Sequence, residues 1–377
     1  MALDKKNILL VDGLHRSGLA VAAALKDAGD FTIDVACTHR GFFDTARRYA
    51  YFRLIDRVDF TGVSFSDRTF PDRILDIAAR RNTDIILPTG SSAIPISLIK
   101  PKLESLCTVL VEDYEKLLLF HDKSLTLGMV RDLDIPHPAT WLPENREEAE
   151  TLADEISYPV VIKARKSTAA EGVWYAKDKS ELIRLYNKAT NWKKNGDGMI
   201  RDSSKPMIQE YISGELHDVA AFCIKGDMKL GLTQKRLMTT PLSGGMGIVN
   251  VTTKNEQLLH YAEKIIDRVQ WNGVMLMDFI IDNRSGVPKL LEVNPRFWGT
   301  TWLTIKAGYN YPLYLVQNAD GLKIDYPSDY EAGLYCRWPI RELYTIFDKP
   351  VSVKVALDRF GGFISRFKLK KCIYQLS

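Results

Sequence analysis

The sequence is poor in the residues that would support disulfide, zinc or thiol chemistry. Its 377 residues include only five cysteines and six histidines. None of them forms a Cys-x-x-Cys pair or has the spacing of a zinc site. The first residues, Met1 to Lys6, are charged rather than apolar and do not look like a signal peptide. We therefore expect a reduced, cytoplasmic chain without zinc or a catalytic thiol.

Long hydrophobic runs are also missing, since the longest apolar stretches are too short for a transmembrane helix. The formal net charge is only +4, and no basic patch interleaved with aromatic residues is visible, so nucleic acid is not an expected partner. A single hydrophobic core rarely grows past about 250 to 300 residues. The length of the chain therefore predicts two or three domains in a soluble protein.

Glycine is scarce in the two loops where nucleotide fingerprints would need it. The turn after the first apolar strand has Gly13 and Gly18 but lacks the middle glycine of the dinucleotide fingerprint. The loop at residues 166–172 lacks the order Gly-x-x-x-x-Gly-Lys-Ser/Thr, and Gly172 is its only glycine. These absences argue against a dehydrogenase and against a Walker loop.

The most informative motif is a predicted hairpin late in the chain, with two apolar strands around the polar turn 282–286. Because side chains alternate along a strand, Glu292, Asn294 and Arg296 leave one face together. Asp278 on the partner strand is expected directly or diagonally across from Glu292. Two carboxylates and an amide suit magnesium that also binds substrate phosphates. Arg296 can hold an anionic intermediate through two hydrogen bonds. The alternative is a surface hairpin with solvated charges.

Two earlier segments suit a nucleotide. The apolar strand at 159–163 ends in Lys163, whose charge suits an α- or β-phosphate, and small residues follow it. A second apolar strand supplies Gln209, Glu210, Tyr211 and Ile212, with Glu215 just after the next turn. Its backbone can read the adenine edge, Glu210 can accept from the amino group, and the carboxylate beyond the turn can bind the ribose hydroxyls.

These pieces in this order resemble the ATP-grasp superfamily over about residues 110–320, beginning at Asp122-Lys123. The resemblance implies ATP and two magnesium ions, for which manganese can substitute. The implied ATP-binding residues are Lys123, Lys163, Gly172, Gln209, Glu210, Tyr211, Ile212 and Glu215, and the implied metal ligands are Asp278, Glu292 and Asn294. By the same resemblance, Arg296 steadies an acyl phosphate.

The chain departs from the family pattern in two places. Many family members carry the ribose glutamate two residues after the glycine, where this chain has Leu216. We expect Glu215 to substitute, with Asp218 as the alternative. The phosphate loop is also poorer in glycine than in the carboxylases of the superfamily, which weakens a carboxylase function.

The segment from Thr233 to Gly247 is expected to be an active-site loop. Arg236 or Lys235 would neutralise the transferring γ-phosphate as a catalytic group. The glycines of the segment permit close backbone approach to an anion or a second substrate. The alternative is an ordinary flexible surface loop with basic residues.

The first hundred or so residues predict a parallel α/β layer, with strands at 7–11, 31–36 and 84–88 and helices at 19–28 and 72–81. By the family resemblance this layer is a Rossmann-like domain in front of the ATP-grasp domain, whose strand ends often bind the substrate. The candidate substrate contacts are Gly13, Ser17, Thr89, Gly90 and Ser91. Alternatively, these loops merely turn the chain.

The expected fold class is a multidomain α/β and α+β protein. The expected domains are an α/β domain at 1–118, an ATP-grasp domain at 119–320 with a small lobe at about 152–212 and a metal-binding lobe at about 213–320, and a C-terminal extension at 321–377. From Val351 the chain mixes basic and apolar residues. It could make weak contact with an anionic membrane surface, but a terminal helix packed on the core explains the pattern as well.

The expected function is that of a ligase that transfers the γ-phosphate of ATP to a substrate carboxylate, after which an amine displaces phosphate from the acyl phosphate. Similarity within the superfamily points to amino acids or peptides as substrates and to carbamoyl-phosphate-synthase-like proteins. The alternatives are a non-catalytic nucleotide-binding regulatory protein and an enzyme of the carboxylase or carbamoyl-phosphate type. Related proteins are commonly dimers, so a homodimer is a further expectation.

Overall fold

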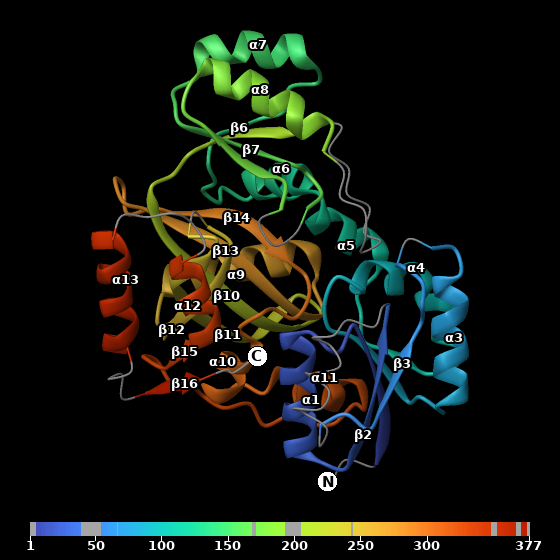
Figure 1. Cartoon of the computed structure of the whole chain (residues 1–377). Coiled ribbons are helices and arrows are strands. Elements are labelled where there is room, and N and C mark those ends of the chain that lie inside the picture. Colours follow the sequence, from blue (N-terminus) through green and yellow to red (C-terminus); the bar gives the residue numbers. More distant parts are fainter. Residues whose placement is uncertain are drawn as a thin grey trace.

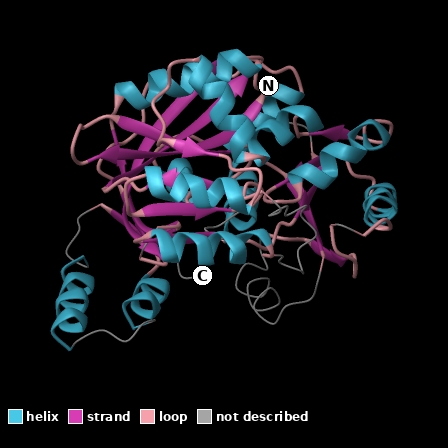
Figure 2. Ribbon diagram, turned by 90° about the horizontal axis from the view of Figure 1, so that it is seen from above, coloured by secondary structure: helices cyan, strands magenta, loops and turns pink. Residues whose placement is uncertain are grey.

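The computed structural model describes residues 5–38, 54–65, 67–167, 171–192, 205–242, 244–347, 353–366 and 371–374. Within these residues the strands form three sheets, of five, four and seven strands (Figure 1). Helices lie along the strands on more than one side, as the view from above shows (Figure 2). The predicted mixed α/β fold is confirmed.

The N-terminal sheet is parallel and has the order β3-β2-β1-β4-β5. Its strands are β1 (Lys6–Val11), β2 (Phe31–Cys37), β3 (Arg57–Phe60), β4 (Ile85–Pro88) and β5 (Thr108–Val109), and its helices are α1 (Arg16–Ala28), α3 (Phe70–Arg80) and α4 (Ala93–Leu103). Most residues of β1 and β2 are buried, as expected for a parallel sheet covered on both faces. This is the parallel α/β layer that the sequence predicts, in a doubly wound strand order.

The four-stranded sheet forms the lobe at the top of Figure 1. It contains β6 (Thr140–Trp141), β7 (Val160–Lys163), β8 (Val173–Ala176) and β9 (Met207–Glu210), in the order β6-β9-β7-β8. Helices α7 (Arg146–Glu155) and α8 (Lys179–Thr190) bury their apolar faces against it. Asn145 and Asp178 cap these helices through backbone amides of the first turn. Helices α5 (Tyr114–His121) and α6 (Lys123–Asp132) precede this lobe.

The seven-stranded sheet has the order β14-β13-β10-β11-β12-β15-β16. Its strands are β10 (Gly214–Ile224), β11 (Asp227–Thr240), β12 (Met246–Thr253), β13 (Gly273–Asp282), β14 (Pro288–Asn294), β15 (Tyr335–Arg337) and β16 (Cys372–Tyr374), with α9 (Glu256–Val269) packed on one face. The predicted active-site loop at 233–247 is wrong for most of its length. β10 and β12 pair with β11 on both sides and hold Thr233 to Arg236 in the middle of a strand.

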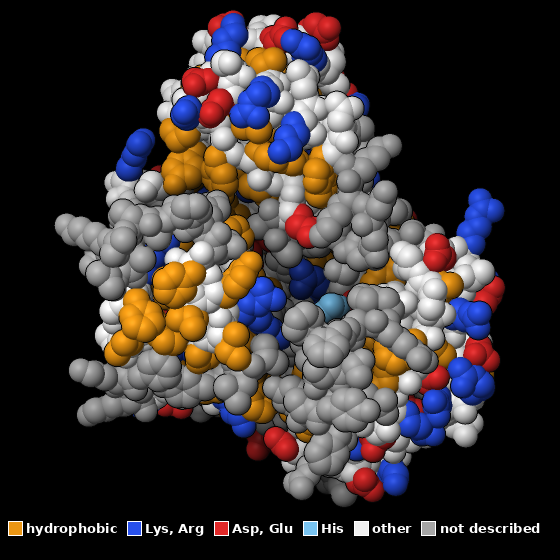
Figure 3. All heavy atoms as spheres, viewed as in Figure 1, with side chains coloured by type: hydrophobic (Ala, Val, Ile, Leu, Met, Phe, Trp, Pro, Cys, Tyr) orange, Lys and Arg blue, Asp and Glu red, His pale blue; other side chains and the backbone are white. Residues whose placement is uncertain are grey.

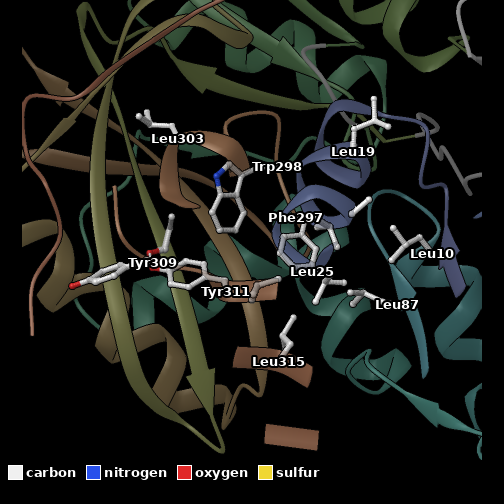
Figure 4. Close-up of a cluster of buried hydrophobic side chains, with 14 of the residues drawn as sticks. Leu10, Leu19, Leu25, Leu87, Phe297, Trp298, Leu303, Tyr309, Tyr311 and Leu315 are labelled. Atoms are coloured by element: carbon white, nitrogen blue, oxygen red, sulfur yellow. Dashed lines mark hydrogen bonds between the residues drawn. The ribbon is translucent and has the colours of Figure 1, made fainter. Parts of the chain in front are cut away.

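One hydrophobic core joins the N-terminal sheet to the seven-stranded sheet. Helices α10 (Thr301–Lys306) and α11 (Tyr311–Ala319) pack against α1. Figure 4 shows Phe297 beside Leu25, with Leu10 and Leu87 on the N-terminal side and Tyr311 on the other side. The N-terminal sheet is therefore held firmly against the remainder of the chain, and its strand ends keep a fixed position beside the larger sheet.

The C-terminal helices are α12 (Pro339–Phe347) and α13 (Val353–Ser365), which pack against each other. Glu342 is fully buried and binds Arg337 at 2.7 Å, and Arg366 binds its other oxygen. In the parts of the chain that the structure describes, no helix has the length and apolar character needed to cross a bilayer. The predicted weak membrane contact falls partly on residues outside the described ranges, and no finding supports it.

Candidate active site

A cavity of about 680 Å³ opens where the three sheets meet. Its walls come from the strand ends of the N-terminal sheet, from the inner face of the small lobe and from one face of the seven-stranded sheet. Figure 3 shows the molecule hollowed near the centre of this face, with Lys and Arg side chains in and beside the hollow. The volume is in the range of small-molecule sites.

The predicted metal-binding hairpin lines the cavity. Asp278 on β13 lies directly opposite Glu292 on β14, as the alternation predicts. The Asn294 amide donates to Glu292 Oε1 at 3.2 Å, and Arg296 donates to Asn294 Oδ1 at 3.1 Å. All four side chains face the cavity. The sequence thus anticipates this arrangement, while the roles of the residues stay predictions.

The donor set fits a magnesium ion. Asp278 lines the cavity, and its Oδ1 is buried and accepts no hydrogen bond from any described residue, so this carboxylate oxygen lacks a donor or cation. Two carboxylates and an amide are hard oxygen ligands of the kind that magnesium prefers. Within the described ranges no group of three or more His, Cys, Asp or Glu side chains is arranged around a common point. Phosphate oxygens or water would have to complete the coordination.

Arg236 links Asp278, one of the predicted metal ligands, to a third acid. Asp218 on β10 lies directly opposite Asp278. Arg236 on β11 binds Asp218 Oδ2 at 3.0 Å and Asp278 Oδ2 at 2.6 Å. Burial raises the pKa of Asp278 to about 8, and the neighbouring carboxylates of Asp218 and Glu292 add to this shift while Arg236 opposes it. Burial and the carboxylates of Asp218 and Glu292 therefore outweigh the cation of Arg236, and a further cation would favour the charged form of Asp278.

Two lysines lie beside Glu292. Lys123 Nζ donates to the Ser167 carbonyl at 2.9 Å and lies 3.6 Å from Glu292 Oε2. Lys163 Nζ donates to Gln209 Oε1 at 2.7 Å. Burial would raise the pKa of Glu292, but Lys123 and Lys163 outweigh it and lower the pKa to about 2. Residues 168–170 of the predicted phosphate loop lie outside the described residues.

The predicted adenine-binding strand also lines the cavity, which includes Gln209, Glu210, Tyr211 and Ile212. Apolar side chains face this end from both lobes: Val161 and Val173 from the small sheet, and Leu216, Ile280 and Leu291 from the large sheet. Apolar walls on two sides suit a flat apolar ring.

Two predicted residues point the wrong way. Glu215 and Lys235 lie outside the cavity, whereas Leu216 and Arg236, their neighbours in sequence, line it. Glu215 and Lys235 instead bind each other at 2.6 Å. The reason is strand alternation, which turns every second side chain of β10 and β11 to the opposite face. The proposed site therefore excludes both. Asp218, the alternative ribose ligand, faces the cavity, but Gln234 and Arg236 already bind it.

Three predicted positions have structural roles instead. Gly172 has φ of +66° and lies outside the lining, where a side chain would press on Ala164. A Cβ at Gly13 would lie 2.9 Å from Leu10 and Val35 side-chain atoms. Thr89 is fully buried and donates to the carbonyls of Val11 and Asp12. These positions shape the turns behind the cavity and do not reach it.

The other N-terminal candidates reach the cavity. Ser17, Gly90 and Ser91 line it, together with Asp12, His15 and Arg16, which sequence reasoning did not single out as ligands. His15 Nε2 lies 3.1 Å from Asp12 Oδ1. The Arg16 guanidinium lies 4.7 Å above the centre of the Trp338 ring, so an aromatic face supports this cation.

Comparison with known proteins agrees with this geometry. Residues 120–300 match the family model of the ATP-grasp domain. The N-terminal section of the carbamoyl phosphate synthase large chain of Methanopyrus kandleri is 24% identical over 273 residues, which is 67% of this chain and 46% of that one. The chain contains an ATP-grasp domain, as the sequence resemblance implies. The match spans less than half of that relative, and only 23% of the arginine-specific large chain of Bacillus subtilis.

Solved structures share the fold at low identity. One is the biotin carboxylase domain dimer of Hydrogenobacter thermophilus 2-oxoglutarate carboxylase in complex with MgADP, ADP and bicarbonate. It has a TM-score of 0.70 and 18% identity, over 88% of this chain and 73% of that chain. Another is N5-carboxyaminoimidazole synthetase from Staphylococcus aureus, with a TM-score of 0.66 and 12% identity, over 89% of this chain and 82% of that chain.

Proposed function

We propose that the protein is an ADP-forming ligase that joins a carboxylate substrate to an amine through an acyl phosphate. One observation carries the proposal. A single cavity contains the carboxylate pair Asp278 and Glu292, the lysines and Arg296, next to an apolar slot that suits a purine. Phosphoryl transfer needs positioned cations around the transferring group rather than a protein nucleophile. The ATP-grasp domain match at residues 120–300 supports the same reaction class.

In this proposal the strand end from Gln209 to Ile212 binds the adenine edge between the apolar walls. Lys123 and Lys163 bind the phosphates. The helix cap at Asp122, which Arg165 binds at 2.8 Å, holds the start of α6 and thereby positions Lys123. Gln209 accepts from Lys163 and donates to Thr140, so this lysine is also held in one orientation.

The reacting groups meet at the hairpin. Asp278, Glu292 and Asn294 would hold magnesium, which when bound supplies positive charge to the phosphate oxygens. Arg236 neutralises charge on the transferring phosphoryl group from the β11 side. Arg296 holds the acyl phosphate through its planar fork while the amine attacks. The attack breaks the carbon–oxygen bond to phosphate, forms the carbon–nitrogen bond and releases phosphate and a proton.

A non-catalytic nucleotide-binding protein is the main competing function. It would need the adenine slot and the lysines, but it has no use for Arg296 or for a cavity-lining carboxylate such as Asp278, whose buried Oδ1 has no donor among the described residues. Carbamoyl phosphate synthase relatives raise a second alternative. The carboxylase and carbamoyl-phosphate functions would take bicarbonate as the carboxylate substrate.

The test is release of ADP and phosphate from MgATP in the presence of carboxylates and amines, supplied singly and in pairs, with bicarbonate included. We expect release to require two substrates and to fall at least 100-fold in Glu292→Gln. Glu263→Gln, at an exposed position on α9, is the matched control and should keep full activity. Turnover that survives Glu292→Gln would refute the assigned site, and turnover with bicarbonate alone would favour the carboxylase alternative.

A further inference from the structure

Three buried polar side chains in the cavity wall have hydrogen-bonding atoms that no described residue satisfies. They are Gln234 on β11, Asn250 on β12 and Trp298 just after β14. Each is at most 2% exposed. None is needed for the binding of nucleotide or metal described above. Buried polar atoms are normally paired, so three neighbouring exceptions in one wall point to a ligand.

Gln234 presents an acceptor of fixed identity. Its Nε2 donates to Asp218 Oδ2 at 2.7 Å and to Thr300 Oγ1 at 2.8 Å, which uses both hydrogens. Its Oε1 therefore has to be an acceptor, and it is buried without a donor. The group that completes this site must carry an N–H or O–H.

Asn250 presents one donor and one acceptor. Neither atom of its amide has a partner among the described residues, although the side chain is fully buried. It lies opposite Arg236 in the β11–β12 pairing. A Cβ at Gly247 would overlap the Asn250 amide, so this glycine leaves the space that the amide occupies.

Trp298 presents a second donor. Its indole nitrogen is buried without an acceptor, and in Figure 4 it points away from the rings of Phe297 and Tyr311. The next residue, Gly299, lies against Met246, and Met246 Sδ in turn lies 3.8 Å from Arg16 Nη1. The cation of Arg16 therefore belongs to the same part of the wall.

We propose that Gln234, Asn250 and Trp298 form a subsite for an α-amino acid, which is one of the two substrates of the proposed ligase. The ammonium donates to Gln234 Oε1 and Asn250 Oδ1. The carboxylate accepts from Trp298 Nε1 and Asn250 Nδ2 and lies near the charge of Arg16. A zwitterion matches a wall that offers acceptors and donors together, whereas a simple carboxylate would leave Gln234 unpaired and a simple amine would leave Trp298 unpaired.

The inference rests on the proposed function, but its test is a binding measurement without turnover. The whole protein, saturated with MgADP, is titrated by calorimetry with each of the twenty proteinogenic amino acids. For each one that binds, the carboxylic acid without the amine and the amine without the carboxylate are titrated as matched probes. The variants are Trp298→Phe, which removes only the N–H and two ring atoms, Gln234→Met and Gly247→Ala.

We expect at least one amino acid to bind, both matched probes to bind far more weakly, and each variant to weaken binding by about tenfold or more. Trp271→Phe is the control, because Trp271 is another buried indole with an unpartnered nitrogen but lies outside the cavity. It should leave amino-acid binding unchanged. MgADP affinity, measured in the same samples, should be unchanged in all four variants and shows that they fold.

Failure to bind any amino acid in the presence of MgADP would overturn the proposal, since the subsite would then hold only water. Binding that the three variants leave intact would also overturn it. Amino-acid binding that depends on the three residues, without any ADP release from MgATP, would support the subsite while refuting the ligase function.

Discussion

At the scale of single residues, we expect Lys163 to make nucleotide binding depend on pH. Burial lowers its pKa to about 8 in the folded protein. Since this is below the ordinary value for lysine, the charged form disfavours folding, and Lys163 destabilises the protein below about pH 8 relative to pH 10.

A phosphate bound next to Lys163 favours the charged form of the lysine. MgATP should therefore bind with constant affinity below about pH 7 and lose up to about tenfold per pH unit above pH 8. Lys163→Arg should remove this slope in calorimetric titrations from pH 6 to 9.5, and equal slopes in both proteins would contradict the assignment.

Asp278 should control the affinity for magnesium. Its Oδ1 is buried in the cavity wall without a donor, and Arg236 binds its other oxygen. Asp278→Asn should weaken magnesium-dependent ADP binding by about tenfold or more. A magnesium titration at fixed ADP measures the effect. Asp282→Asn is the control, since Asp282 is on the same strand but outside the cavity. Equal magnesium dependence in the two variants would refute the assignment of Asp278 as a magnesium ligand.

At the scale of elements, the alternation of β11 separates two adjacent cations. Arg236 faces the cavity, where Asp218 and Asp278 raise its pKa despite burial, and Lys235 faces the other way. Arg236→Ala should reduce kcat at least 100-fold, comparable to the loss of one oxyanion donor. Lys235→Ala should change kcat and KM by less than about threefold, as for a surface ion pair. A large loss of activity in Lys235→Ala would mean that Lys235, and not Arg236, faces the cavity.

The C-terminal helices depend on one buried ion pair. Arg337 and Glu342 are both fully buried, and the carboxylate binds Arg337 and Arg366. Glu342→Gln keeps the shape but leaves Arg337 with an uncompensated charge. Breaking a buried pair on one side costs about 3 to 5 kcal/mol. Urea unfolding should show a loss of this order, and an unchanged midpoint would show that α12 is not held by this pair.

The hairpin could be predicted from the sequence because its pairing is local. The strand that ends at Gln209 to Ile212 could be predicted from its own apolar run and the turn after it, although β9 pairs with β6 and β7, which lie much earlier in the chain. Asp278 and Glu292 lie on consecutive strands, so the alternation alone places them opposite each other. The sequence does not predict that Asp218 lies beside Asp278. Their strands, β10 and β13, are neighbours in the sheet, but β11 and β12 lie between them in the sequence. Residues 233–236 looked like a loop because β11 has a polar cavity on one face, which removes the usual apolar alternation.

At the scale of the whole molecule, the N-terminal sheet and the ATP-grasp domain share one core. Phe297 is 1% exposed and packs in the cluster that joins them. Phe297→Ala should cost about 3 to 5 kcal/mol, as for other buried aromatic truncations, and should also weaken substrate binding because Arg16 and Asp12 lose their fixed position. Urea unfolding and amino-acid titration of the same variant measure both effects. A stability loss without any change in substrate affinity would show that the N-terminal sheet does not serve the site.

The central claim is that a substrate carboxylate becomes an acyl phosphate, and hydroxylamine trapping tests it most directly. The protein is incubated with MgATP, hydroxylamine and each of a panel of carboxylates, and hydroxamate is measured together with the nucleotide product. We predict hydroxamate and ADP in equal amounts for at least one carboxylate, and neither product in Glu292→Gln. Formation of AMP and pyrophosphate, or hydroxamate that persists in Glu292→Gln, would contradict the account.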